Sequence, residues 1–284
     1  MYKENGSAAL SVSDFSRLSS FIYNQCGIKM PDSKKIMVEA RLRKRLRDLN
    51  MQTYAEYCNF LFSQKGSEEE ITHMVDVITT NKTDFFREPK QFSFLSDIAL
   101  PEFVNTDGAG IQRPLKVWSA GCSTGEEPYT LSIVLNEFGQ KFTRYTFSIL
   151  ATDISTRVLE KAATGIYEEE KIEPISKSLV YKYFLRSKSK EKKLVRVVPQ
   201  LRSSVKFQWL NFMQDDFGIR ETFDLIFCRN VIIYFDKPTQ EKLIEKLVNQ
   251  LKPGGFFFLG HSESIFNTNL PLVQVAASTY KKIK

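Results

Sequence analysis

Apolar residues recur every three or four positions through the first 80 residues, a spacing that predicts helices with one buried face. Ser13 is the expected N-cap of the first helix, and Gly27 is placed to end it. Ser67 and Glu70 have the spacing of a capping box at the start of the last helix. Residues 1–80 are therefore predicted to form a small all-helical unit, with helices at 13–25, 32–49, 54–63 and from 67 onward.

From Leu115 onward the pattern changes to short apolar runs separated by helical segments. Strands are predicted at 115–120, 146–152, 205–210, 223–228, 256–260 and 274–282, and helices at 126–138, 155–163 and 238–251. This alternation is typical of a parallel, doubly wound α/β sheet. Residues 186–204 interrupt it and are expected to form a small antiparallel hairpin. Residues 105–114 are expected to be a polar linker, and residues 252–255 a turn.

A glycine-containing turn follows the first predicted strand. In VWSAGCSTGEEPY, residues 117–129, Gly121 and Gly125 allow positive φ and close approach of the backbone to a ligand. Glu126 and Glu127 follow directly, so the turn is unsuited to phosphate, and it lacks the P-loop and dinucleotide signatures. The segment predicts either a site for a cationic or hydroxyl-rich small molecule or a plain strand-to-helix turn.

Polar residues at the ends of the predicted strands are further candidates, because ligands of doubly wound sheets bind at the carboxyl ends of strands. Together with Ser119 to Gly125 of the turn, these candidates are Asp153, Asn211, Arg229 and Asn230. Asp153 suits a ribose diol, and it equally suits the N-cap of the helix at 155–163. The segment TTNKTDFFREPKQFSF, residues 79–94, holds several Phe residues and Arg87, and it predicts either a domain joint or an aromatic clamp for a ligand.

The composition of the chain constrains its number of domains, its cellular compartment and its capacity to bind metals. A chain of 284 residues suits two domains, and 42% hydrophobic with 26% charged residues is a globular balance. No apolar run approaches the ~20 residues that cross a bilayer, and residues 1–12 lack the apolar core of a signal peptide. Four scattered cysteines without a C-x-x-C pair indicate a reducing cytoplasm, and with only two histidines no metal site is expected.

The net charge of +7 is concentrated in two segments. Residues 34–47 carry +6 and residues 182–206 carry +8, which leaves −7 on the rest of the chain. Two basic regions on an otherwise acidic protein suggest docking to nucleic acid, anionic lipid or an acidic protein. In the predicted helix at 32–49, three cations lie opposite the apolar stripe and form either a docking surface or a plain solvated face. They are Arg43, Lys44 and Arg47.

Five motifs, in order along the chain, resemble the chemotaxis-receptor methyltransferases, the CheR family. They are TTNKTDFFRE, VWSAGCSTGEEPYTL, ATDIS…VLEKAATGIY, FDLIFCRNVIIYFD and LKPGGFFFLGHSES. The resemblance runs from about residue 13 to the C-terminus. It implies an all-helical N-terminal domain over residues 1–88 and a class I, Rossmann-like methyltransferase domain over residues 89–284, with a small antiparallel β-subdomain at about 186–204.

The resemblance also implies S-adenosylmethionine as methyl donor, S-adenosylhomocysteine as product, and glutamates on the cytoplasmic helical bundle of chemoreceptors as acceptors. With Gly121 of the turn included, the expected cofactor contacts are Asn81, Thr83, Arg87, Gly121, Glu127, Asp153, Asn211, Phe212, Arg229 and Asn230. Arg87 and Tyr234 are the expected catalytic residues, and Arg43, Lys44 and Arg47 the expected substrate-binding residues. The β-subdomain is a candidate site for a receptor C-terminal peptide. The protein is expected to be a cytoplasmic monomer that binds no nucleic acid.

The chemistry of the residues agrees with a carboxylate acceptor. Such an acceptor is ionised at pH 7, with an ordinary pKa of ~4.3, so its methylation needs positioning rather than a general base. Two other functions stay open. A sequence pI of about 9.1 and the basic regions suggest a nucleic-acid methyltransferase, although no Asn/Asp-Pro-Pro-Tyr/Phe base-flipping loop is present in the sequence. The other is a non-catalytic signalling adaptor.

Overall fold

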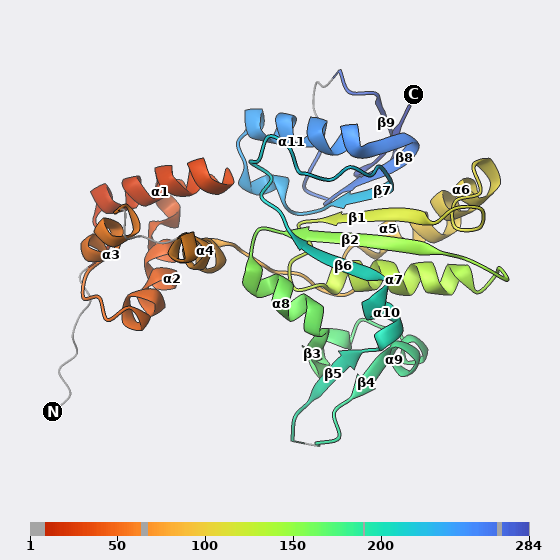
Figure 1. Ribbon diagram of the computed structural model, residues 1–284, viewed down its shortest axis with the longest axis horizontal. Coiled ribbons are helices and arrows are strands. Elements are labelled where there is room, and N and C mark those ends of the chain that lie inside the picture. Colours follow the sequence, from red (N-terminus) through yellow and green to blue (C-terminus); the bar gives the residue numbers. More distant parts are fainter. Residues whose placement is uncertain (1–8, 64–67, 190, 266–268, 284) are drawn as a thin grey trace.

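The computed structural model describes residues 9–63, 68–189, 191–265 and 269–283 (Figure 1). A helical lobe, drawn in red and orange, lies beside a central sheet flanked by helices, and a small second sheet lies below α8 and α10 in this view. The mixed α/β sheet, the helical N-terminal part and the small antiparallel sheet are all confirmed. The predicted cap at Ser67 lies outside the described residues.

The helical lobe is built around one apolar cluster. Its elements are α1 (Val12–Cys26), η1 (Asp32–Lys34), α2 (Lys35–Asp48), α3 (Tyr54–Leu61) and α4 (Glu68–Ile78). The prediction that Ser13 caps α1 is wrong, because Ser11 has the extended backbone of an N-cap and its side chain accepts a hydrogen bond from the Asp14 N–H at 3.0 Å. Gly27 ends α1 as predicted, with φ at 72°.

In the described part of the chain, seven strands form the main sheet in the order β6-β2-β1-β7-β8-β10-β9. They are β1 (Leu115–Ala120), β2 (Phe147–Asp153), β6 (Val205–Trp209), β7 (Phe223–Cys228), β8 (Leu251–Leu259), β9 (Leu272–Ala276) and β10 (Thr279–Lys282). The first five in this order pair in parallel, and the chain reverses its winding between β1 and β7. This reversal is the switch point at which ligands of such sheets bind.

Three predictions about strands and loops are wrong. The expected last strand at 274–282 is an antiparallel hairpin of β9 and β10, with Ser278 at φ 49° in its turn. Residues 252–255 belong to β8, where they form an irregularity in its pairing with β7. Residues 105–114 are no linker: Ala109 is fully buried, and the N–H of Gly110 donates to the Arg113 carbonyl at 2.7 Å.

Helices cover both faces of the sheet (Figure 1). One face packs against α5 (Pro89–Phe94), the π-helical turn η2 (Leu95–Ala99), α6 (Leu100–Thr106), α7 (Glu126–Gly139) and α8 (Thr156–Thr164), and the other against α11 (Lys237–Gln250). The aromatic residues of segment 79–94 belong to this core: Phe92 stacks on Phe227, with 6.2 Å between ring centroids, and Phe85 is 1% exposed. None of the Phe residues of this segment is in the cavity wall described below, so its rings form a domain joint and not an aromatic clamp.

A β-subdomain follows α8. It contains β3 (Ile166–Glu168), η3 (Glu169–Ile172), α9 (Lys177–Tyr183), β4 (Phe184–Arg186) and β5 (Leu194–Val197), and it leads into α10 (Pro199–Ser203). The predicted hairpin is β4 with β5, but the sheet also includes β3, and residues 199–203 are helical. Tyr167 donates to the Thr124 carbonyl at 2.7 Å, and Lys171 donates to the Thr83 carbonyl at 2.9 Å. The subdomain therefore braces both the glycine-containing turn and segment 79–94.

Candidate active site

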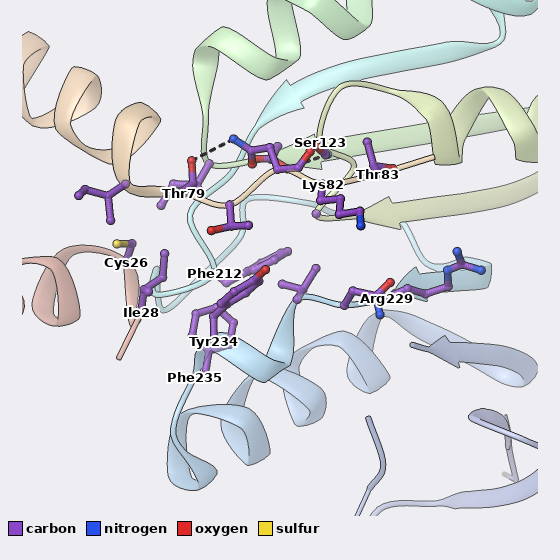
Figure 2. Close-up of a pocket in the computed structure, with 18 of the residues that line it drawn as sticks. Cys26, Ile28, Thr79, Lys82, Thr83, Ser123, Phe212, Arg229, Tyr234 and Phe235 are labelled. Atoms are coloured by element: carbon purple, nitrogen blue, oxygen red, sulfur yellow. Dashed lines mark hydrogen bonds between the residues drawn. The ribbon is translucent and has the colours of Figure 1, made fainter. Parts of the chain in front are cut away.

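A cavity lies between the helical lobe and the carboxyl ends of β1, β2, β6 and β7 (Figure 2). The structure brings together in its wall every residue expected from the sequence to contact the cofactor, and also Tyr234. The helical lobe contributes further wall residues, among them Cys26, Ile28 and Met37. A position in the wall is compatible with ligand binding, and the individual roles of these residues stay predictions.

The turn after β1 is held in a strained shape against this cavity. Gly121 has φ 86°, and a Cβ at this position would lie 2.4 Å from Cγ2 of Val231. Ser123, at φ 48°, donates from its N–H to Asp153 Oδ2 at 2.8 Å and from its hydroxyl to the Asn81 carbonyl at 2.9 Å. The turn is thus tied both to the end of β2 and to segment 79–94.

Asp153 is a buried carboxylate at the end of β2, with 8% of its surface exposed. Its Oδ1 accepts a hydrogen bond from the Ser155 N–H at 3.0 Å. Ser155 is the N-cap of α8, so the alternative interpretation of Asp153 as that cap is wrong. Burial raises the pKa of Asp153, and the backbone N–H groups of Ser155 and Ser123 oppose this effect. Each oxygen keeps a lone pair with which it can accept a ligand hydroxyl.

Glu127 and Arg229 form a buried ion pair, in which Arg229 Nε donates to Glu127 Oε2 at 2.8 Å. The other guanidinium nitrogens of Arg229 donate to Gln91 Oε1 and to the Arg87 carbonyl, at 2.8 and 2.7 Å. Figure 2 shows the Arg229 side chain running away from the middle of the cavity. The guanidinium of Arg229 is therefore fully used by hydrogen bonds to protein groups. The predicted contact with a cofactor can come only from the backbone and the aliphatic part of this residue.

Glu126 and Glu127 are neighbours in sequence but differ in environment. Glu127 lines the cavity and also accepts a hydrogen bond from the Ser119 hydroxyl at 2.8 Å. Glu126 is outside the cavity wall, 1% exposed, and accepts from the Thr124 hydroxyl at 2.6 Å. Burial raises the pKa of Glu126. The expectation that both acids lie beside a ligand is therefore wrong for Glu126.

Arg87 and Tyr234 keep polar groups available in the cavity. In the described residues, the only hydrogen-bond partner of the Arg87 guanidinium is the Lys82 carbonyl, at 3.0 Å from Nη1. The Tyr234 hydroxyl has no hydrogen-bond partner in that same part of the chain, and the side chain is half-buried. Cys26 is unsuited to act as a nucleophile, because burial raises the pKa of its thiol to about 11.

The predicted basic face is exposed on α2. Arg43, Lys44 and Arg47 point to solvent, while Val38, Leu42 and Leu46 of the same helix are buried. Arg43 forms one ion pair, with Glu39 at 3.3 Å. The structure places none of the three cations in the cavity wall, so any contact they make with a substrate is outside the cavity.

Several residues of the site were not predicted from the sequence. Gln91 holds Arg229 in place, and Lys29, Lys34 and Lys82 add positive charge to the cavity wall. Ser123, which lies in the predicted turn, holds Asp153. Lys82 belongs to the motif TTNKTDFFRE, and this position is a usable signal. Lys29 and Lys34 come from the helical lobe, and nothing in the local pattern connected them with the strand ends.

Comparisons with known proteins fit this architecture. The family model described as the CheR methyltransferase SAM binding domain matches residues 81–281, and the one described as the CheR methyltransferase all-alpha domain matches residues 13–79. A chemotaxis protein methyltransferase of Borreliella burgdorferi is 39% identical over 282 residues, covering 99% of this chain and 98% of that protein.

Two further relatives show a similar likeness. Chemotaxis protein methyltransferase 2 of Pseudomonas aeruginosa is 39% identical and covers 94% of this chain and 92% of that protein. The chemotaxis protein methyltransferase of Escherichia coli K12 is 39% identical and covers 90% of this chain and 86% of that protein. The fold and the matching cofactor domain define an S-adenosylmethionine-dependent methyltransferase. The chain belongs to the CheR methyltransferase family and acts in chemotaxis. None of its described helices is both long and apolar enough to cross a membrane.

Proposed function

We propose that the protein transfers the methyl group of S-adenosylmethionine to glutamate side chains of chemotaxis receptors, which yields glutamyl methyl esters. The observation that carries this proposal is the charge of the cavity wall. Its cations Lys29, Lys34, Lys82 and Arg87 outnumber its carboxylates, and one of those carboxylates is already paired with Arg229. A positive wall without a histidine among its residues suits an acceptor that brings its own negative charge and needs no general base.

The residues of the cavity wall fit S-adenosylmethionine. The role that we assign to each residue below is part of the proposal. Asp153 would hold the ribose hydroxyls, since its orientation is set by two backbone N–H groups. Glu127 would accept hydrogen bonds from the amino group of the cofactor. The rings of Phe212 and Tyr234 would flank the apolar and sulfonium parts of the cofactor. When bound, the cofactor supplies an electrophilic methyl group attached to a positively charged sulfur.

The chain's own residues then provide positioning. The free N–H groups of Arg87 would hold one oxygen of the acceptor carboxylate and direct the other toward the methyl carbon. The new oxygen–carbon bond would form as the carbon–sulfur bond broke, and the electron pair of the broken bond would stay on sulfur. A carboxylate and a sulfonium become a neutral ester and a neutral thioether, so no proton moves. Orientation of this kind is worth up to about 7–11 kcal/mol in well-ordered systems.

The exposed cations of α2 would guide the acceptor to the cavity. Arg43, Lys44 and Arg47 form a local positive field on α2, and the chain outside the two basic segments, residues 34–47 and 182–206, carries −7. A glutamate-rich helix of a receptor complements this field, and such charges act mainly on the rate of encounter. A receptor acceptor of this kind would place the enzyme in the cytoplasm. The β4–β5 region stays our candidate for a receptor C-terminal peptide.

Transfer of labelled methyl groups tests the proposal. The purified protein is incubated with labelled S-adenosylmethionine and receptor cytoplasmic fragments, with and without their C-terminal tails, and in parallel with RNA. We expect label in the receptor that mild base releases as methanol, because carboxyl esters hydrolyse and methylated bases or amines do not. Label in RNA alone would favour the nucleic-acid alternative, and binding without turnover would favour the adaptor.

A further inference from the structure

The motif LKPGGFFFLGHSES ends just outside the cavity wall. Its acid, Glu263, has no role in the chemistry described above. Glu263 is 4% exposed and does not belong to the cavity wall. The acid follows the end of β8, in a turn closed by its own N–H, which donates to the Gly260 carbonyl at 2.9 Å. A buried carboxylate of this kind is costly unless several donors surround it.

The donors to Glu263 are backbone N–H groups from two neighbouring strand ends. Oε2 accepts from the Asn230 N–H and from the Gly260 N–H, both at 2.7 Å, and Oε1 accepts from the Ile233 N–H at 3.3 Å. The carboxylate therefore holds residues 230–233, which follow β7 and include the start of η4 (Ile232–Tyr234). This connection carries Asn230 and Tyr234 into the cavity wall.

The backbone of Asn230 has an uncommon shape. Its φ is 59°, in the left-handed region, which asparagine adopts more readily than most residues other than glycine. A Cβ on Gly260 would lie 2.4 Å from Asn230 Nδ2, so the turn after β8 presses closely against it. Glu88 connects the same turn to the Arg87 segment, because its Oε1 accepts from the His261 N–H at 3.1 Å.

We propose that Glu263 is a positioning residue for methyl transfer, which holds the 230–234 connection so that Asn230 and Tyr234 meet the cofactor and the acceptor in a productive geometry. Glu263 acts only through these residues and touches no reacting atom. The proposal depends on the methyltransferase activity of the chain and not on glutamate being the acceptor.

The isosteric variant Glu263→Gln isolates this role. An amide has one accepting oxygen, so its NH₂ group must face either the N–H of Ile233 or those of Asn230 and Gly260. Glu263→Asp keeps the charge and both acceptors but is shorter by one carbon. Glu221→Gln is the matched control, because Glu221 is exposed and its ion pair with Lys116, at 2.7 Å, lies outside the site.

The experiment combines calorimetric binding of S-adenosylhomocysteine with methyl-transfer kinetics, at a temperature where melting curves show each full-length variant fully folded. We expect Glu263→Gln to weaken binding about 10-fold and to lower kcat by about 100-fold, the scale of a misplaced reactive group. The KM for the acceptor should change less than kcat. Glu263→Asp should recover part of both losses, and Glu221→Gln should match the wild type.

A merely structural role would lower the melting temperature of Glu263→Gln and leave binding and kcat of the folded enzyme unchanged, and that result would overturn the proposal. Failure of both Glu263→Gln and Glu263→Asp to fold would also overturn it, since the residue would then serve the fold. The binding measurement needs no acceptor, so it keeps its meaning even when the receptor-glutamate proposal fails.

Discussion

Arg229 donates from Nη2 to the main-chain oxygen of Arg87 at 2.7 Å, and the two arginines thereby divide the work of the site. Arg229 is 6% exposed, and each of its guanidinium nitrogens is bound to a protein acceptor. Arg87 is half-buried and leaves most of its donors free. The first arginine is a structural brace that connects Glu127 with the Arg87 segment, and the second is available to a ligand.

Lysine should not replace Arg229 in this bracing role. Arg229→Lys leaves one ammonium where three directed donors served Glu127, Gln91 and the Arg87 carbonyl. Because the ammonium can still pair with Glu127, we expect the free energy of unfolding to fall by less than the about 3–5 kcal/mol that removal of one partner of a buried ion pair costs, and cofactor binding to weaken. Urea titration and calorimetry measure the two effects. Wild-type stability would contradict the assignment of Arg229 as a brace.

Arg87 and Tyr234 should matter more for turnover than for cofactor affinity, because their free polar groups can reach an acceptor. For Arg87→Met we expect kcat to fall by about 100-fold, and for Tyr234→Phe by a smaller factor, with the Kd for S-adenosylhomocysteine within a few-fold of wild type. Steady-state kinetics and calorimetry on the same preparations separate the two quantities. Unchanged rates in both variants would show that the proposed catalytic residues are wrong.

Asp153 should dominate cofactor affinity. Asp153→Asn replaces a charged acceptor whose oxygens are oriented by the N–H groups of Ser123 and Ser155. Hydrogen bonds to charged groups contribute about 1.5–3 kcal/mol, so we expect the Kd to rise by roughly 10- to 100-fold. Asp97→Asn, at an exposed position on η2, serves as control. An unchanged Kd in calorimetry would remove Asp153 from the binding site.

The basic face of α2 should act through long-range attraction. Reversal of Arg43, Lys44 and Arg47 to Glu is expected to raise the receptor KM or slow association, and to reduce the salt dependence of the rate. Charges of this kind are screened over ~8 Å at physiological ionic strength. Cofactor affinity should stay the same, since none of the three residues lines the cavity.

A charge-matched control separates the basic face from net charge. The control reverses three exposed cations outside the helical lobe: Lys141, Arg144 and Lys237. Normal methylation by the α2 variant at low salt would mean that this face is merely solvated. Equal losses in both variants would attribute the effect to net charge.

Asp224 should make stability depend on pH in the acid range. Burial raises its pKa, but hydrogen bonds from Arg113, the Lys116 N–H and Lys252 outweigh burial and hold the pKa below its ordinary value. The stabilisation is therefore present above the unfolded pKa of about 3.9 and is lost as the pH falls through the lower folded value. Asp224→Asn should cost about 3 kcal/mol at pH 7 and flatten this acid dependence in urea titrations. A variant with wild-type acid sensitivity would exclude Asp224 as the group responsible.

The sequence by itself determined the architecture and predicted many residues of the cavity wall. The apolar runs that became β1 and β7 can be buried on both sides only in a central strand, and both strands have the predicted bounds. The polar residues after such strands meet because the carboxyl ends of parallel strands share one edge of the sheet. The five motifs connected these strand ends with segment 79–94, and the residues so named line one cavity.

Only the tertiary structure decided which way individual side chains point and which partners their polar groups bind. Glu126 and Glu127 look alike in sequence, but α7 presents only Glu127 to the cavity because of the way that helix packs on the sheet. The donors of Arg229 are satisfied by Gln91 and the Arg87 carbonyl as well as by Glu127, and the Asn230 N–H donates to Glu263, 33 residues away. Periodicity reports which face of an element is buried, whereas these partners are chosen by packing between distant segments, and no local pattern records that choice.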